Sequence, residues 1–284
     1  MTRRPLVGLL PLLVAVGVAL AGCSGDDPPP DDPTPSATPS PSATPTPTPP
    51  PTAEPVPEPA VDACYDLDFD EAVSPTTDAE PVRCRRPHTS QTYQVGRVDN
   101  LVDGHLLAID SQQVQDDVAG TCPDALGDAV GGSPDDLRLS VLRPVWFTPT
   151  LEQAAAGAAW YRCDVVVLAD SESLLPVRGP LDGVLDTDEG RERFGMCGTA
   201  APDAPDFERV PCGEDHTWRA FSVIDLPGQR FPGPQAVAEA GDGPCEDAAA
   251  AVADDPLDYE YAYEGPDADQ WELGQRFVRC WAPD

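Results

Sequence analysis

Apolar positions after residue 60 recur with the spacing of short strands and of single amphipathic helices. Residues 92–98 alternate as a strand does, residues 160–168 form an apolar run, and the shorter segments 81–84 and 138–142 are also typical of strands. Residues 111–129 instead carry an apolar side chain at every fourth position, at Val114, Val118, Cys122 and Leu126. This part of the chain therefore predicts a few strands and one helix.

The same order of elements returns in the last third of the chain. Residues 209–212, 218–224 and 276–281 are strand-like. A helix is predicted over residues 234–253, either continuous or broken at 241–244 by Gly and Pro. We therefore expect an α+β fold of two tandem small disulfide-stapled domains, each a helix packed on a short, mostly antiparallel sheet.

Composition divides the chain further. Residues 24–59 consist mostly of Pro, Thr, Ser, Ala and Asp and cannot bury enough apolar surface to fold, so we predict a disordered, extended tether. The segment 171–190 is rich in Pro, Gly and Asp and is the expected boundary between the copies. The predicted organisation is a lipoprotein signal peptide at 1–22, a tether at 23–60, a first domain at 61–175 and a second at 190–284.

The first residues have the pattern of an exported lipoprotein. Arg3 and Arg4 precede an apolar run over residues 6–20, which is short for a membrane span. The motif Leu-Ala-Gly-Cys at 20–23 resembles the bacterial lipobox, so Cys23 is predicted to be the lipidated N-terminus of the mature chain. A plain signal peptide that ends near a cysteine is the alternative. The lipid would anchor the protein to the outer face of the cytoplasmic membrane, facing the cell wall.

Eight further cysteines repeat one layout: Cys64, Cys84, Cys122 and Cys163, then Cys197, Cys212, Cys245 and Cys280. Exported proteins normally oxidise their thiols, so we predict two disulfides in each copy, although more than one pairing is open. The first two cysteines of a copy suit a hairpin, and the other two would clamp the helix to the last strand. The favoured pairs are Cys64–Cys84, Cys122–Cys163, Cys197–Cys212 and Cys245–Cys280.

The chain is strongly acidic, with 50 Asp and Glu residues, 17 basic residues and a net charge of −33. All the basic residues are arginine, a composition typical of GC-rich genomes such as those of actinobacteria. Such a surface repels nucleic acids and anionic lipid headgroups and favours solubility or cationic partners. Nucleic-acid binding is therefore excluded as a function.

Candidate chemistry is limited to the ionisable residues that recur in both copies. His88 and His216 each follow a cysteine by four positions, and Arg162 and Arg279 each directly precede one. An imidazole just after a disulfide more often bonds neighbouring backbone and orders the loop than it acts as a base or ligand. No nucleophile motif accompanies either histidine, so we expect no catalytic residue.

Metal and cofactor binding are not expected either. The cysteines lack the C-x-x-C spacing of zinc sites, and the acidic clusters at 66–71 and 182–189 do not fit the EF-hand pattern. The tryptophans fall in or near predicted strands and are expected in the core. Trp271 has polar neighbours on both sides, which makes it the best candidate for an exposed contact.

One run of residues in the second copy is similar to a known family. The sequence Val-Pro-Cys-Gly-Glu-Asp-His at 210–216 is followed by Cys245, Pro266, Trp271, Gly274, Arg276 and Cys280. This order resembles the actinobacterial septum formation domain family of secreted, membrane-attached proteins. The first copy departs from it, with Ala154 and Ala159 where Trp271 and Arg276 stand. The resemblance implies a role at the division septum without an established activity.

The sequence therefore favours a non-catalytic envelope lipoprotein that binds an envelope protein or a cell-wall component. Its candidate recognition residues are His88, His216, Trp271 and Arg276. The alternatives are a cell-wall hydrolase that uses His88 or His216, and a solute-binding lipoprotein. An enzyme should hold a histidine and a carboxylate together in a cleft, whereas a binding module should present an exposed aromatic or charged patch.

Overall fold

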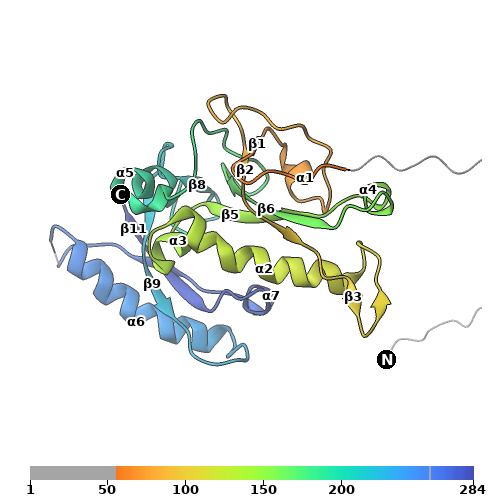
Figure 1. The fold of residues 1–284 in the computed structure, drawn as a ribbon. Coiled ribbons are helices and arrows are strands. Elements are labelled where there is room, and N and C mark those ends of the chain that lie inside the picture. Colours follow the sequence, from red (N-terminus) through yellow and green to blue (C-terminus); the bar gives the residue numbers. More distant parts are fainter. Residues whose placement is uncertain (1–55, 256) are drawn as a thin grey trace, which may run out of the picture. The chain divides into compact units, whose positions relative to one another are not determined.

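The computed structural model describes residues 56–255 and 257–284 (Figure 1). The predicted signal peptide, Cys23 and all but the end of the predicted tether lie outside the described residues. Over the described part the fold is α+β, as predicted: helices pack on antiparallel sheets, and four disulfides are present. None of its helices is both long and apolar enough to cross a membrane.

The first half of this region forms a four-stranded antiparallel sheet in the order β1-β2-β6-β5. Its elements are β1 (Cys64–Tyr65), α1 (Phe69–Ala72), β2 (Ser90–Arg97), the hairpin β3 (Leu101–Val102) and β4 (His105–Leu106), α2 (Gln112–Val130), α3 (Pro134–Arg138), β5 (Leu142–Phe147), α4 (Leu151–Ala155) and β6 (Trp160–Val167). Helix α2 packs on β2, β5 and β6 through the apolar face that the sequence predicted.

The second half forms a five-stranded antiparallel sheet in the order β10-β11-β9-β7-β8. Its elements are η1 (Val184–Asp186), α5 (Asp188–Phe194), β7 (Met196–Gly198), β8 (Arg209–Pro211), β9 (Trp218–Asp225), α6 (Pro234–Val252), β10 (Ala262–Glu264), α7 (Ala268–Glu272) and β11 (Phe277–Pro283). Helix α6 packs on β9, β10 and β11 and buries Val237, Gly241, Cys245 and Ala249, again one residue in four.

The two sheets place corresponding elements in the same order. The sequence β1-β2-β6-β5 of the first sheet matches β7-β9-β11-β10 of the second, and α2 and α6 are both 19 residues long. Strand β8 lies at the edge where the first half has only a bridge between Cys64 and Val82. The two sheets thus share one strand order, while the interpretation as two copies and the domain boundaries drawn from composition stay predictions.

One local prediction differs from the structure, and the structure decides one alternative that the sequence left open. Residues 138–142 are not a strand: Pro134 and the Ser133–Asp136 capping box start helix α3, and β5 begins only at Leu142. The helix predicted over 234–253 is continuous and is not broken at 241–244. A side chain at Gly241 would meet Val278 at 2.8 Å, so glycine there lets α6 lie close against β11.

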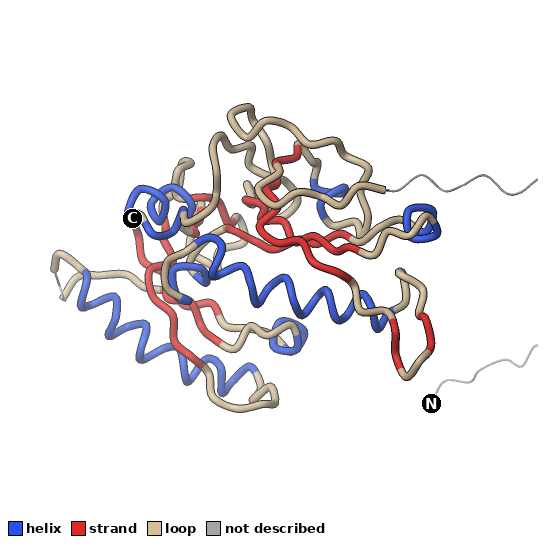
Figure 2. The backbone as a smooth tube through the Cα atoms, in the orientation of Figure 1, coloured by secondary structure: helices blue, strands red, loops and turns tan. Residues whose placement is uncertain are grey.

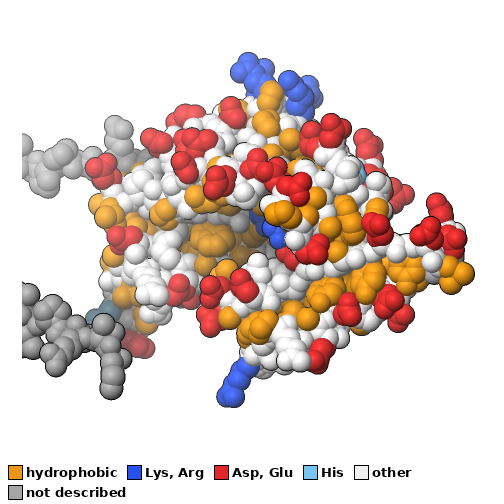
Figure 3. Space-filling model, turned by 180° about the vertical axis from the view of Figure 1, so that it is seen from behind, with side chains coloured by type: hydrophobic (Ala, Val, Ile, Leu, Met, Phe, Trp, Pro, Cys, Tyr) orange, Lys and Arg blue, Asp and Glu red, His pale blue; other side chains and the backbone are white. Residues whose placement is uncertain are grey.

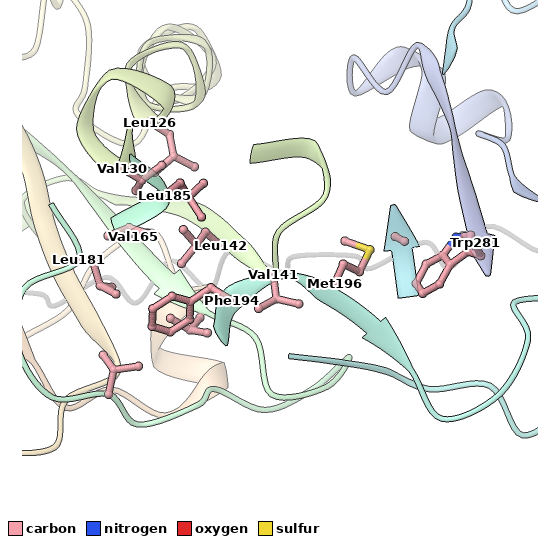
Figure 4. Packing of buried hydrophobic residues seen from close by; sticks show 13 residues of the cluster. Leu126, Val130, Val141, Leu142, Val165, Leu181, Leu185, Phe194, Met196 and Trp281 are labelled. Carbon is pink, nitrogen blue, oxygen red and sulfur yellow. The ribbon is translucent and has the colours of Figure 1, made fainter. Parts of the chain in front are cut away.

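One hydrophobic cluster joins the two halves (Figure 4). It combines Leu126 and Val130 of α2 and Val141, next to β5, with Met196 of β7 and Trp281 of β11. Backbone bonds cross at the same place, from the Val141 N–H to the Phe194 carbonyl (2.9 Å) and from the Met196 N–H to the Leu139 carbonyl (2.6 Å). The two sheets therefore share part of their core.

The segment 171–190, expected to be a boundary, is packed into this core. Figure 2 shows it mostly as loop, yet Val177, Leu181 and Leu185 are each at most 2% exposed. Val177 exchanges two backbone hydrogen bonds with His88, at 3.1 and 2.8 Å. Composition predicts a loop here correctly, but the apolar side chains spaced along it hold that loop against the first sheet.

Candidate functional site

The eight cysteines form four disulfides in the pairs that the sequence favoured. Cys64–Cys84 and Cys122–Cys163 lie in the first half, and Cys197–Cys212 and Cys245–Cys280 lie in the second. The longer-range bond of each half ties a helix to a central strand, α2 to β6 and α6 to β11. The disulfides therefore fix the two helix-on-sheet units that frame the rest of the site.

His88 is a buried loop residue. Its side chain is inaccessible to solvent, and its Nδ1 lies 3.0 Å from the carbonyl oxygen of Arg86. The Nε2 atom is buried and has no hydrogen-bond partner among the described residues. The bond to nearby backbone is the structural role predicted for this histidine, and burial keeps the ring away from any partner in this conformation.

His216 makes the equivalent backbone contact and one more. Its Nδ1 lies 2.7 Å from the carbonyl oxygen of Glu214, and its Nε2 lies 3.1 Å from a carboxylate oxygen of Asp284. The Cys197 sulfur belongs to the same group of atoms, all within 4.8 Å of one another. That sulfur is bonded to Cys212 and offers no thiolate to a metal ion.

Trp271 is not the exposed contact that its polar neighbours suggested. It is 2% exposed and packs in a cluster with Val237 and Val278, with its ring edge-to-face against Phe231 at 6.0 Å. Helix α7 has only five residues, and it turns the polar neighbours outward while the indole points into the core. The role of Trp271 is therefore packing.

Arg276 lies over this buried indole. Its guanidinium is 5.7 Å from the Trp271 ring centroid and donates to the side-chain oxygen of Gln229 at 3.2 Å. The indole N–H donates to the backbone carbonyl of the same Gln229 at 3.4 Å. Arg276 and Trp271 therefore hold the loop after β9 to helix α7. The indole presents no exposed surface that a binding partner could recognise.

Of the two repeated arginines, Arg162 is locked in a closed network. It is 3% exposed, and its guanidinium lies 3.1 Å from the fully buried carboxylate of Asp164. The hydroxyls of Ser90 and Thr92 donate to the same carboxylate at 2.6 and 2.7 Å. The guanidinium also lies over the Tyr65 ring at 3.7 Å from the centroid. Arg162 is thus enclosed in the core of the first half, where its Nε has no hydrogen-bond partner among the described residues.

Arg279, its counterpart, faces a cleft between the two sheets instead. Trp281 of the second half stands where Asp164 stands after Arg162, so this arginine has no such carboxylate two residues on. Its Nε donates to the carbonyl of Arg138 at 2.9 Å, across the contact between the halves. Glu264, paired with Arg279 across β10 and β11, has a carboxylate oxygen 3.8 Å from the guanidinium.

The cleft has a volume of about 570 Å³, and charged, polar and apolar side chains line it together. Arg143, Arg209 and Arg279 supply three positive charges, and Glu264 is the acid that pairs with Arg209 and Arg279. The apolar lining residues are Val141, Leu168, Met196 and Phe207, and the remaining polar ones are Asp170, Ser171, Glu172, Glu208, Gln270 and Gln275. Figure 3 shows basic atoms inside a hollow of the surface, with acidic side chains around it.

The three arginines of the cleft repel one another. Burial, together with the positive charges of Arg279 and Arg209, lowers the pKa of Arg143 to about 10, against the opposing effect of Glu264. Burial also lowers the pKa of Arg279. Arginine side chains stay protonated in proteins, so three positive charges lie beside the one negative charge of Glu264, while the more exposed Asp170, Glu172 and Glu208 complete the lining. An added negative charge would relieve this repulsion.

Two further groups in the lining lack hydrogen-bond partners among the described residues. One is Oε2 of Glu264, an acceptor, and the other is Nε2 of Gln275, a donor, and both atoms are buried. Buried polar atoms are nearly always satisfied in native proteins, so these two mark a place where a polar ligand could bond. The cleft thus offers both a donor set and an acceptor.

The sequence singled out one member of this site. Arg279 stood out as a repeated residue, but Arg143, Arg209 and Glu264 are isolated charged residues in or at the ends of three strands. A charge within an otherwise apolar strand, as at Arg143 in β5, is the signal that could have indicated an inward-facing polar site.

One family model matches part of this chain, residues 147–280. No curated protein and no solved structure matches this chain significantly. The matched segment includes every residue of the cleft lining except Val141 and Arg143. It runs from the end of β5 through β6 and the strands of the five-stranded sheet into β11, so it spans the contact between the halves. Residues 147–280 match the family model described as "Septum formation".

Proposed function

We propose that this protein is a non-catalytic binding module of the cell envelope that acts in septum formation, with the cleft between its two sheets as the binding site. The family match over residues 147–280 supports a role in septum formation or cell division. The observation that carries the binding role is the cleft itself, where three arginines gather beside the partly buried Glu264, with three further acids in the lining, in a chain of net charge −33. Such a concentration of opposite charge is typical of a recognition site.

Anchoring of the protein is part of this proposal. Lipid attached at Cys23 would hold the chain on the outer face of the cytoplasmic membrane, and the tether would carry the folded part toward the wall. The four disulfides fit an oxidising location outside the cytoplasm. The partner is then an envelope protein or a cell-wall component.

The alternative of a wall hydrolase rests on His216, which has a carboxylate 3.1 Å away in Asp284. A base also needs a nucleophile or a water in reach. The neighbouring Thr217 hydroxyl donates instead to the backbone carbonyl of Thr199 at 2.8 Å, and neither His216 nor Asp284 is part of the cleft lining. We therefore favour the binding role.

The proposed function can be tested by depleting the protein in the bacterium that makes it and supplying the wild-type or a variant gene. Loss of the protein should delay or misplace septa, and the wild-type gene should restore them. An Arg279→Gln variant that folds normally should not restore them, while the exposed Arg97→Ala change should. Normal septation without the protein would refute the role, and wall-degrading activity that disappears in His216→Ala would favour the hydrolase.

A further inference from the structure

We propose that the cleft binds the carboxylate end of a short peptide, with the carboxylate held by Arg143 and Arg279 and a peptide N–H directed at Glu264. This inference rests on the proposed binding function and adds the chemical class of its ligand. The argument has three steps, which concern the sign of the ligand's charge, its size and charge number, and the arrangement of its polar groups.

The positive charge of the cleft selects an anionic group. Arg279 has a side chain 8% exposed, and one glutamate shared with Arg209 is the acid that compensates it. Arg143 has one terminal nitrogen fixed by the backbone carbonyls of Ser140 and Leu142, at 3.0 and 2.6 Å. These bonds hold the guanidinium in place before any ligand arrives, and its other N–H groups have no partner among residues 56–255 and 257–284, which leaves them open to a carboxylate.

The surroundings favour a small monoanion over phosphate or a polyanion. Asp170, Glu172 and Glu208 also line the cleft, and the chain as a whole carries −33. Their repulsion rises with each further negative charge on the ligand, whereas one carboxylate is balanced by the arginines. A volume of about 570 Å³ admits a peptide of a few residues.

The remaining groups fit the other features of a peptide end. Glu264 Oε2 is a buried acceptor without a hydrogen-bond partner, which suits a peptide N–H, and Gln275 Nε2 is a buried donor in the same state, which suits a peptide carbonyl. Val141, Leu168, Met196 and Phe207 provide an apolar surface for the terminal side chain. A carboxylate, an N–H, a carbonyl and an apolar side chain together describe a peptide C-terminus.

Titration calorimetry with the purified full chain tests the inference without any mutation. The probes are N-acetyl-Ala-Leu with a free carboxylate, the same peptide as its C-terminal amide, and inorganic phosphate. The free acid should bind about 10- to 100-fold more tightly than the amide, because the amide loses the charged hydrogen bonds. Binding should weaken with added salt. Equal affinity for acid and amide, or tighter binding of phosphate, would overturn the proposal.

Variants then locate the site. Arg279→Gln should abolish the preference for the free acid. Arg97→Ala should leave it unchanged, because the Arg97 side chain is 70% exposed and, among the described residues, forms an ion pair with Glu58 alone. Glu264→Gln should tighten the binding of acetate, which has no N–H, since a competing carboxylate charge is removed. Acetate binding that weakens in Glu264→Gln would contradict the charge argument, and melting curves check that each variant is folded.

The two proposals can fail separately. If the peptide acid does not bind but Arg279→Gln still disrupts septation, the ligand class is wrong and the binding function stands. If the peptide acid binds at the cleft but loss of the protein leaves septation normal, the ligand class stands and the septal role is wrong.

Discussion

The buried pair of Arg162 and Asp164 provides the sharpest test of how the first half is held together. Replacing Asp164 by alanine removes an ion pair at 3.1 Å and the acceptor for two hydroxyls, all at positions closed to solvent. The guanidinium of Arg162 would remain buried without a counter-charge. Breaking such a pair from one side costs about 3–5 kcal/mol, a large part of the roughly 5–15 kcal/mol that stabilises a typical domain.

Urea unfolding, followed by tryptophan fluorescence, measures this cost. At a slope of about 2–3 kcal/mol per molar urea, the midpoint of Asp164→Ala should fall by about 1–2 M. The exposed pair of Arg97 and Glu58 is the matched control, and its removal should cost at most about 1 kcal/mol. The double variant Arg162→Met/Asp164→Val should recover part of the loss, because no charge is left buried.

The refuting results are specific. If Asp164→Ala costs no more than removal of the exposed pair, the network does not stabilise the first half. If the double variant lowers the free energy of unfolding by the sum of what Arg162→Met and Asp164→Val lower it singly, the two residues act independently. The buried charge left behind is then not the cause of the loss.

Three other predictions concern a disulfide, the two histidines and the lipid on Cys23. Replacing Cys245 and Cys280 together by alanine should lower the free energy of unfolding by about 4 kcal/mol for a sequence separation of 35, and a cost below about 1 kcal/mol in denaturant melts would contradict the chain-entropy argument. His88→Ala should cost about 1–3 kcal/mol and more than His216→Ala, because only the first ring is fully buried; equal melting temperatures would contradict this. Mass spectrometry of membranes should find diacylglycerol on Cys23, and an unmodified chain that begins elsewhere would exclude the anchor.

The sequence predicted those parts of the fold whose signal is local. The four-residue spacing of Val114, Val118, Cys122 and Leu126 belongs to one helix, so it can be recognised without knowing which element the helix packs against. The disulfide pairs followed from loop lengths and from the elements that carry each cysteine.

Features that depend on contacts between distant segments were missed. Trp271 was misjudged because a five-residue helix is too short to show which side faces the core. The cleft was missed because Arg143 and Arg279 meet only after both sheets have docked, and each is an ordinary charged residue within its own strand. Residues 171–190 were interpreted by composition alone, although Val177, Leu181 and Leu185 already formed an apolar series.

The disulfides also imply an order in which reducing agents would act on the molecule. Cys122, Cys163, Cys245 and Cys280 are all inaccessible to solvent, whereas Cys84 and Cys212 are each partly exposed. Thiol–disulfide exchange requires access to a sulfur atom, so a thiol should open the two hairpin bonds first. The bonds that hold α2 and α6 on their sheets would then survive until those helices detach, and mild reductive stress would loosen the edges of both sheets while their helices stay in place.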